Sequence, residues 1–158
     1  MDTTNSNESI ISPPGTIDLG GKTYLVSKPM EKDVFAVAMY AKKLAKRKYN
    51  PIRETLDALQ GLTASEEAKT AVILQAHRVQ SSGEVPADAI SDELMGPKGC
   101  AFYAWILIRK NHPEVTLEQL QALITEDNAV VVFADLDEAS GAKMIHRGFE
   151  DSGFFPQR

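Results

Sequence analysis

The stretch of sequence that decides the fold is residues 97–111, which read PKGCAFYAWILIRKN. Eight consecutive apolar residues occupy its centre, so a helix formed here is apolar on every side and is not a surface helix. A strand is the competing interpretation of this β-rich run, but its length, its initial proline and its terminal Arg109-Lys110 pair favour a helix. We therefore expect a buried central helix in which Phe102 and Trp105 fill the core.

Two helices are expected before this centre, on either side of an Asn-Pro pair. Between Pro29 and Pro51 the apolar residues recur at steps of three and four, which is the period of an amphipathic helix. Asn50 can act as the N-cap of the next helix, with Pro51 at its first position. Gly61 tolerates the left-handed conformation that ends many helices, so it predicts the end of this second helix.

Two further helices are predicted between these and the centre. Residues 63–66 read TASE, a capping-box sequence in which the Thr63 hydroxyl accepts a hydrogen bond from the amide of Glu66. This box predicts a third helix that runs to about residue 80. Pro86 then starts a short fourth helix that ends before Gly96.

The hairpin and the last helices are predicted from turn and cap residues. Gly20-Gly21 separates two short β-rich runs, residues 16–19 and 22–26, and a two-residue glycine loop suits a type I′ hairpin. A second capping box at residues 116–119 starts a helix to about residue 124. A last helix is expected from Asn128 to about residue 139. The fold class is therefore mainly α, a compact multi-helix domain with a short N-terminal β-hairpin and flexible termini.

Both ends of the chain differ in composition from the helical part. Residues 1–15 are polar and end in Pro-Pro-Gly, which predicts a disordered leader. The helical domain is assigned to residues 16–141. Residues 142–158 form a flexible tail with no helical or strand period, in which Phe149, Phe154 and Phe155 are candidates for docking on a partner or on a neighbouring copy. The alternative is that these rings fold back onto their own domain.

Composition limits the compartment and the partners. The 158 residues carry 22 acidic and 17 basic side chains, a net charge of -5, so nucleic acid is an unlikely partner. Cys100 is the single cysteine and the N-terminus lacks a signal-peptide pattern, which indicates the reducing cytoplasm. The longest apolar run is far shorter than the ~20 residues that span a bilayer. We expect no membrane association.

Charge is unevenly distributed along the chain. Residues 28–53 contain eight basic and two acidic residues, whereas residues 110–140 contain one basic and seven acidic ones. Complementary patches of this kind could direct contacts between copies, although ordinary solvated helix faces would look the same. Four of the basic residues share about 140° of helix circumference and are candidates for partner binding: Lys42, Lys43, Lys46 and Arg47.

The sequence offers no recognisable catalytic or metal-binding motif. His77, His112 and His146 lie on different segments, and none belongs to a zinc-binding pattern. Cys100 begins the most apolar segment, where burial makes a thiol inert. Residues 96–100, GPKGC, lack the spacing of a phosphate-binding loop. We therefore expect a non-enzymatic protein without cofactor or metal.

Residues 102–118, FYAWILIRKNHPEVTLE, resemble the tail assembly chaperones of tailed bacteriophages. The shared features are an apolar helix with a Trp, a basic pair, an Asn/His-Pro stop and an acidic residue before a T-x-E helix start. The Gly-Gly hairpin and residues 138–141 resemble the usual opening and ending of that family. We call residues 102–118 the signature stretch, and we interpret its marked residues as scaffold rather than contact surface: Phe102, Trp105, Arg109, Lys110, Asn111, His112 and Pro113.

The resemblance implies a function without catalysis. Such chaperones bind the tape measure protein in the host cytoplasm, keep it soluble and are displaced as tail tube subunits polymerise around it. The implied partners are thus the tape measure protein, the tail tube protein and copies of the chain itself. Two alternatives remain: a structural neck or tail component of the virion, and a small helical regulator that binds DNA through the basic residues from Lys42 to Lys48.

Overall fold

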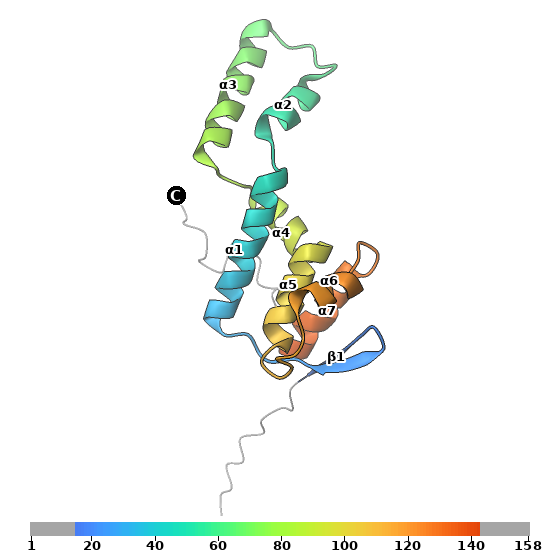
Figure 1. Cartoon of the computed structure of the whole chain (residues 1–158). Helices are drawn as coiled ribbons and strands as arrows, with labels where there is room; N and C mark the ends of the chain where they lie inside the picture. The colour runs from blue at the N-terminus through green and yellow to red at the C-terminus, as the bar shows by residue number, and fades with distance from the viewer. Residues whose placement is uncertain (1–14, 143–158) are drawn as a thin grey trace, which may run out of the picture.

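A computed structural model describes residues 15–142. Within that range the chain forms an antiparallel β-hairpin followed by seven helices (Figure 1), which confirms the predicted fold class. The predicted leader, apart from Gly15, and the predicted aromatic tail with Phe149, Phe154 and Phe155 lie outside the described residues. The elements are β1 (Thr16–Leu19), β2 (Lys22–Leu25), α1 (Glu31–Lys48), α2 (Pro51–Leu59), α3 (Glu66–Ser82), α4 (Ala87–Met95), α5 (Pro97–Ile108), α6 (Leu117–Leu123) and α7 (Ala129–Ser140).

Helix α5 is the centre of the core, as expected from its apolar sequence. It packs against α1, α4, α6 and α7, and Figure 1 shows it surrounded by these elements. Tyr103 and Leu107 are completely buried in it. Gly99 allows its close approach to α4, because a Cβ at this position would lie 2.0 Å from the carbonyl oxygen of Glu93. A larger residue at position 99 would therefore force α5 away from α4.

Two aromatic residues of α5 do not lie where we expected them. Phe102 and Trp105 are half-buried at the edge of the core, so the prediction that they fill it was wrong. The reason is their position on the helix: residues 102, 105 and 109 share one face at 100° per residue. On this face Phe102 packs against Tyr40 of α1, whereas Trp105 and Arg109 lie beside a groove.

The hairpin has the predicted loop. Gly20 and Gly21 have φ values of 57° and 77°, which is the conformation that a type I′ turn requires at both positions. Ile17 lies opposite Tyr24 in the register, and both side chains are buried against the helical core. The hairpin therefore closes one end of the core (Figure 1).

Local capping explains where α2 and α6 begin. The Asn50 side chain accepts a hydrogen bond from the amide of Arg53 at 3.0 Å, as predicted. At α6 the predicted box is present, because the Thr116 hydroxyl accepts from the amide of Gln119 and the Gln119 side chain accepts from the amide of Thr116.

The start of α3 differs from the prediction. Its N-cap is Ser65, whose hydroxyl accepts from the amide of Ala68 at 3.2 Å, and the box predicted at Thr63 was wrong. Thr63 lies in the connecting turn after Gly61, so it is two residues too early to cap the helix. The helix also extends to Ser82 and ends at Gly83, which has a φ of 68°.

The turn after α5 connects three parts of the fold. The Lys110 ammonium lies 2.5 Å from Oδ2 of Asp33 in α1, and the amide of Met30 donates to the same oxygen at 2.8 Å. Asn111 donates to the hydroxyl of Ser27 at 2.8 Å. Nε2 of His112 accepts from the amide of Leu25 at 3.0 Å. These contacts hold the hairpin and the start of α1 against the end of α5.

Helices α2 and α3 pack mainly against each other. Figure 1 shows this pair projecting away from the rest of the molecule. Among residues 15–142, no helix has both the length and the apolar character needed to cross a membrane.

The contact between Asp33 and Lys110 should contribute measurably to the stability of the fold. Asp33 is 3% exposed, and removal of its cation leaves a buried carboxylate that has lost its charged partner. We expect Lys110→Met to lower the free energy of unfolding by about 1–3 kcal/mol, measured by urea denaturation. Lys22→Met is the matched control, since Lys22 lies 3.9 Å from Glu114 at an exposed site, and it should cost less than about 0.5 kcal/mol. Equal losses of stability in the two variants would contradict the conclusion that Lys110 stabilises the buried Asp33 carboxylate.

The Asp33–Lys110 pair also predicts how the stability of the fold depends on pH. Burial raises the pKa of Asp33, but hydrogen bonds from Lys110 and Met30 outweigh burial and leave the pKa below its ordinary value of 3.8. A lowered pKa stabilises the fold above that value, and the contribution is lost as the pH falls through the lower pKa of the folded state. Asp33→Asn should therefore flatten the decline of stability in acid, measured by urea denaturation at stepwise lower pH. If Asp33→Asn left the dependence of stability on acidic pH unchanged, the lowered pKa of Asp33 would be contradicted.

Candidate functional site

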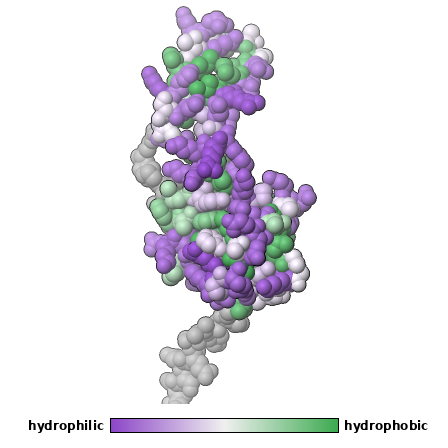
Figure 2. Space-filling model, viewed as in Figure 1, coloured by the Kyte–Doolittle hydropathy of each residue, from purple (hydrophilic) through white to green (hydrophobic). Residues whose placement is uncertain are grey.

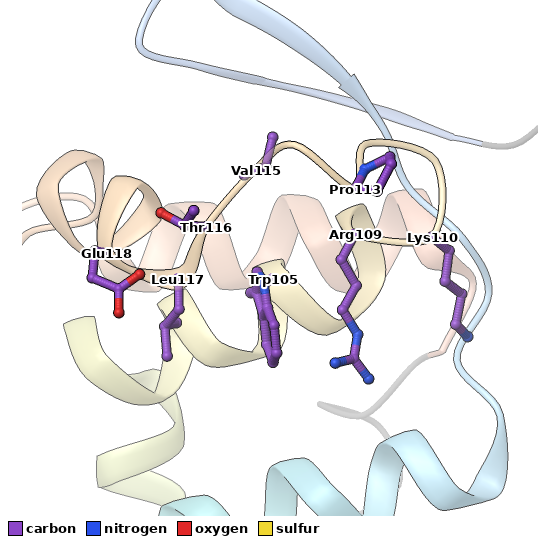
Figure 3. Close-up of a pocket in the computed structure, with 8 residues that line it drawn as sticks. All are labelled: Trp105, Arg109, Lys110, Pro113, Val115, Thr116, Leu117 and Glu118. Carbon is purple, nitrogen blue, oxygen red and sulfur yellow. The ribbon is translucent and has the colours of Figure 1, made fainter.

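A groove of about 670 Å³ lies beside Trp105 and Arg109 at the end of α5. Figure 3 shows it between α5 and the segment that leads into α6. All of its lining residues belong to the signature stretch, so the residues that carry the family resemblance also build the groove. They are Trp105, Arg109, Lys110, Pro113, Val115, Thr116, Leu117 and Glu118.

The groove is apolar in the middle and charged at its ends. In Figure 3 Glu118 lies at one end, Leu117 and Trp105 follow, and Arg109 and Lys110 lie at the other end. Trp105 and Leu117 are half-buried, whereas Glu118 is exposed. A ligand that fits this groove is an amphipathic segment with an apolar side chain in the middle, a basic residue facing Glu118 and an acidic residue facing Arg109 and Lys110.

Trp105 is held in place by a cation. The guanidinium carbon of Arg109 lies 4.3 Å from the centroid of the indole ring, within the range of a cation–π interaction. Arg109 is the C-cap of α5 and lies four positions after Trp105, so the end of the helix sets this arrangement. The indole is therefore ordered before any partner arrives, which reduces the entropy lost on binding.

An aromatic row extends from the groove to α1. The Phe102 ring lies 5.8 Å from that of Trp105 and stacks on Tyr40 with a centroid distance of 4.1 Å and an interplanar angle of 9°. Tyr40 is half-buried. The groove is thus bordered by a row of partly exposed rings rather than by core residues alone.

The marked residues of the signature stretch other than Phe102 fall into two groups, and Lys110 belongs to both. Lys110, Asn111 and His112 make the contacts that hold α1 and the hairpin, so the interpretation as scaffold agrees with their geometry. Trp105 and Arg109 line the groove together with Pro113. For these residues the scaffold interpretation stays a prediction, because a half-buried side chain that lines a groove can support the fold, contact a partner or do both.

The basic residues of α1 lie elsewhere. Lys43, Lys46 and Arg47 are exposed and Lys42 is half-buried, and none of the four lines the groove. They are therefore separate from the groove, and the prediction that they bind a partner stays a prediction.

A second apolar groove, of about 530 Å³, lies between α2 and α3. Figure 2 shows apolar residues gathered on this projecting pair. Leu62 and Val72 line the groove and keep 56% and 48% of their surface exposed. The sequence analysis missed this surface, although leucines at steps of three in residues 56–62 and the apolar run at residues 71–74 were signals for it.

The residues considered for chemistry are dispersed. Cys100 is completely buried, and burial raises the pKa of its thiol to about 12. His77 is exposed on α3, and His112 belongs to the turn after α5. His146 lies outside the described residues. Within residues 15–142 no group of three His, Cys, Asp or Glu side chains could hold a metal ion.

The position of Trp105 can be tested by fluorescence, since it is the single tryptophan of the chain. We expect native emission between the values typical of buried and of denatured tryptophan, with partial quenching by acrylamide. Arg109→Ala should increase this quenching because it uncovers one face of the indole, while Arg78→Ala on the exposed side of α3 should not. Native emission as red-shifted as that in denaturant, or no quenching at all, would contradict the half-buried position.

No family model, curated protein or solved structure matches this chain. The two grooves are therefore interpreted from their own geometry.

Proposed function

We propose that this protein is a tail assembly chaperone that binds the tape measure protein in the host cytoplasm, keeps it soluble and helps the tail tube to polymerise. The proposal starts from the resemblance of residues 102–118 to that family. The observation that carries it is the groove at Trp105, because the resembling residues form a surface suited to an amphipathic helix. The role requires no catalysis and no cofactor.

The groove has the features of a binding site for apolar side chains. A partly exposed Trp beside an Arg is the type of residue pair that dominates the energetics of protein interfaces. Leu117 extends the apolar surface next to Trp105 (Figure 3). An aggregation-prone helix would place its own apolar residues on this surface, which shields them from other copies of itself.

The groove between α2 and α3 supplies a second apolar surface on the same molecule. Its lining includes Leu59, Leu62, Val72 and Val79. Two separate apolar surfaces allow one chaperone to contact a long helical ligand at two places, and many copies can line the same ligand. Modest contacts of this kind also permit displacement, since weak sites release their ligand quickly.

The proposal predicts the outcome of co-expression. The wild-type protein should raise the soluble yield of the tape measure protein encoded beside it and co-purify with it. Leu117→Asp should weaken both effects, because a charge in the apolar middle of the groove opposes burial of the ligand's apolar side chains. Trp105→Ala should act in the same direction through loss of the anchor residue.

A matched control separates binding from folding. Leu25→Thr alters another partly exposed apolar side chain, 40% exposed in β2, and should leave the soluble yield unchanged. Thermal melts of all variants show whether each is folded. Equal solubility of the tape measure protein with and without the wild-type chain would contradict the proposed function, and so would a stoichiometric presence of the protein in purified virions.

A further inference from the structure

We infer that a segment of this chain's own C-terminal tail docks in the groove at Trp105 when no partner fills it. The segment is residues 150–158, which read EDSGFFPQR and lie outside the described residues; we call it the tail segment. The docking is argued from the geometry and charge of the groove and does not depend on which ligand the groove takes. Its consequence, that the tape measure protein must displace the tail segment to reach Trp105, rests on the proposed function.

The groove has opposite charges at its two ends. Arg109 lies over Trp105 at the basic end, and the exposed Glu118 lies at the acidic end (Figure 3). In the part of the chain that the structure describes, the ion pairs include neither Arg109 nor Glu118. Lys110 adds a second positive charge at the basic end, where it is bound to Asp33. A ligand with the complementary order of charges would therefore gain at both ends as well as in the apolar middle.

The tail segment has this complementary order. Glu150 and Asp151 come first, Phe154 and Phe155 follow them, and Arg158 comes last. Acidic residues would thus meet the basic end of the groove, a phenyl ring its apolar middle, and an arginine its acidic end. The reverse direction would place like charges together at both ends, which is repulsive. The charges therefore fix the direction of the tail segment as well as its place.

The spacing within the tail segment suits an extended conformation. Gly153 and Pro156 are poor helix residues, so the sequence favours extended backbone here. In extended backbone, residues separated by an even number of positions point to the same side. Glu150, Phe154 and Arg158 are four positions apart. One face of the tail segment therefore presents an acid, an aromatic ring and a base in the order that the groove requires.

The tail begins beside the helix that carries the groove. The Ser140 hydroxyl lies 3.4 Å from the Tyr103 hydroxyl, and Tyr103 precedes Trp105 by two positions in α5. The chain from Ala142 to Phe154 spans up to about 40 Å when extended, more than three times the width of about 10–12 Å that a helix has with its side chains. The tail segment can therefore reach the groove of its own chain. Because it is tethered there, its effective concentration exceeds that of the tail of a second copy in dilute solution.

A spin label on the tail tests the contact in the purified full-length protein. Gln157→Cys supplies the labelling site next to Arg158. Cys100 does not compete for the label, because it is completely buried and burial raises the pKa of its thiol to about 12. Trp105 is the single tryptophan, so its indole N–H gives one resonance in a heteronuclear spectrum. We expect the nitroxide to remove most of the intensity of this resonance, relative to the same sample after reduction of the nitroxide with ascorbate.

A mixture of two preparations separates docking within one chain from docking between copies. One preparation carries the nitroxide without the nitrogen isotope, and the other carries the isotope without the nitroxide. The Trp105 resonance should keep its intensity in this mixture, because the label and the observed indole are then on different chains.

Removal of the rings should release the tail segment. Phe154→Ser combined with Phe155→Ser should restore the intensity of the Trp105 resonance and increase the quenching of Trp105 fluorescence by acrylamide. Met144→Ser combined with Phe149→Ser is the matched control, because it removes two apolar side chains from the same tail outside the tail segment. This control should leave both signals as in the labelled parent protein.

An exchange of charges tests the pairing at the acidic end. Arg158→Glu and Glu118→Arg should each reduce the loss of intensity, because each places like charges together, and the two combined should bring it back. Glu67→Arg is the matched control, since Glu67 is an exposed acid in the first turn of α3 as Glu118 is in the first turn of α6. It should neither reduce the loss of intensity alone nor restore it in Arg158→Glu. Circular dichroism melts verify that every variant is folded, and the tail variants change no described residue.

Four results would overturn the inference: a Trp105 resonance that keeps its intensity beside the nitroxide while amides of another surface lose theirs, an equal loss of intensity in the mixture, a loss that survives removal of both rings, and charge variants that do not restore each other. None of these measurements involves the tape measure protein. Failure here therefore leaves the proposed chaperone function standing, and failure of the chaperone function leaves the docking of the tail segment standing.

Discussion

The buried carboxylate of Asp33 fixes the geometry on which the surfaces of this protein depend. One oxygen accepts both from Lys110 and from the amide of Met30. A charged group at this depth is tolerated only with a charged partner and hydrogen bonds, so separation of α1 from the end of α5 is costly. That contact ties the start of α1 to the end of α5, and farther along α1 Tyr40 stacks on Phe102.

The residues next to Lys110 extend this constraint to the hairpin. Asn111 and His112 bond to Ser27 and Leu25, and the Tyr24 ring meets the His112 ring edge to face at 5.5 Å. The turn that forms one end of the groove is therefore held from two directions. A rigid frame of this kind explains how a groove can sit at the junction of a helix and a loop and still present Trp105 and Arg109 in fixed positions.

Local signals predicted most of the fold, and tertiary arrangement explains the errors. Asn50, Thr116 and the Gly20-Gly21 turn were predicted correctly because each is decided within four residues. The prediction of Thr63 as the N-cap of α3 failed because Ser65, two residues later, also has a hydroxyl that can accept a hydrogen bond from the first turn of the helix. The apolar run of α5 predicted its central position, but periodicity does not state which neighbours cover which face. Trp105 was therefore assigned to the core, and the α2–α3 groove was missed.

The energetics of the groove favour a ligand that engages more than one apolar site. A partner that covered about 100 Å² of Trp105 and Leu117 would gain about 2.5 kcal/mol, which is less than the 4–15 kcal/mol that association costs in lost freedom of motion. Burial of these two side chains alone therefore does not repay that cost. A long ligand that contacts several such grooves shares the cost among them, because binding at the first raises the effective concentration at the next. Under the proposed function, modest sites of this kind would hold a long ligand firmly and still release it one site at a time.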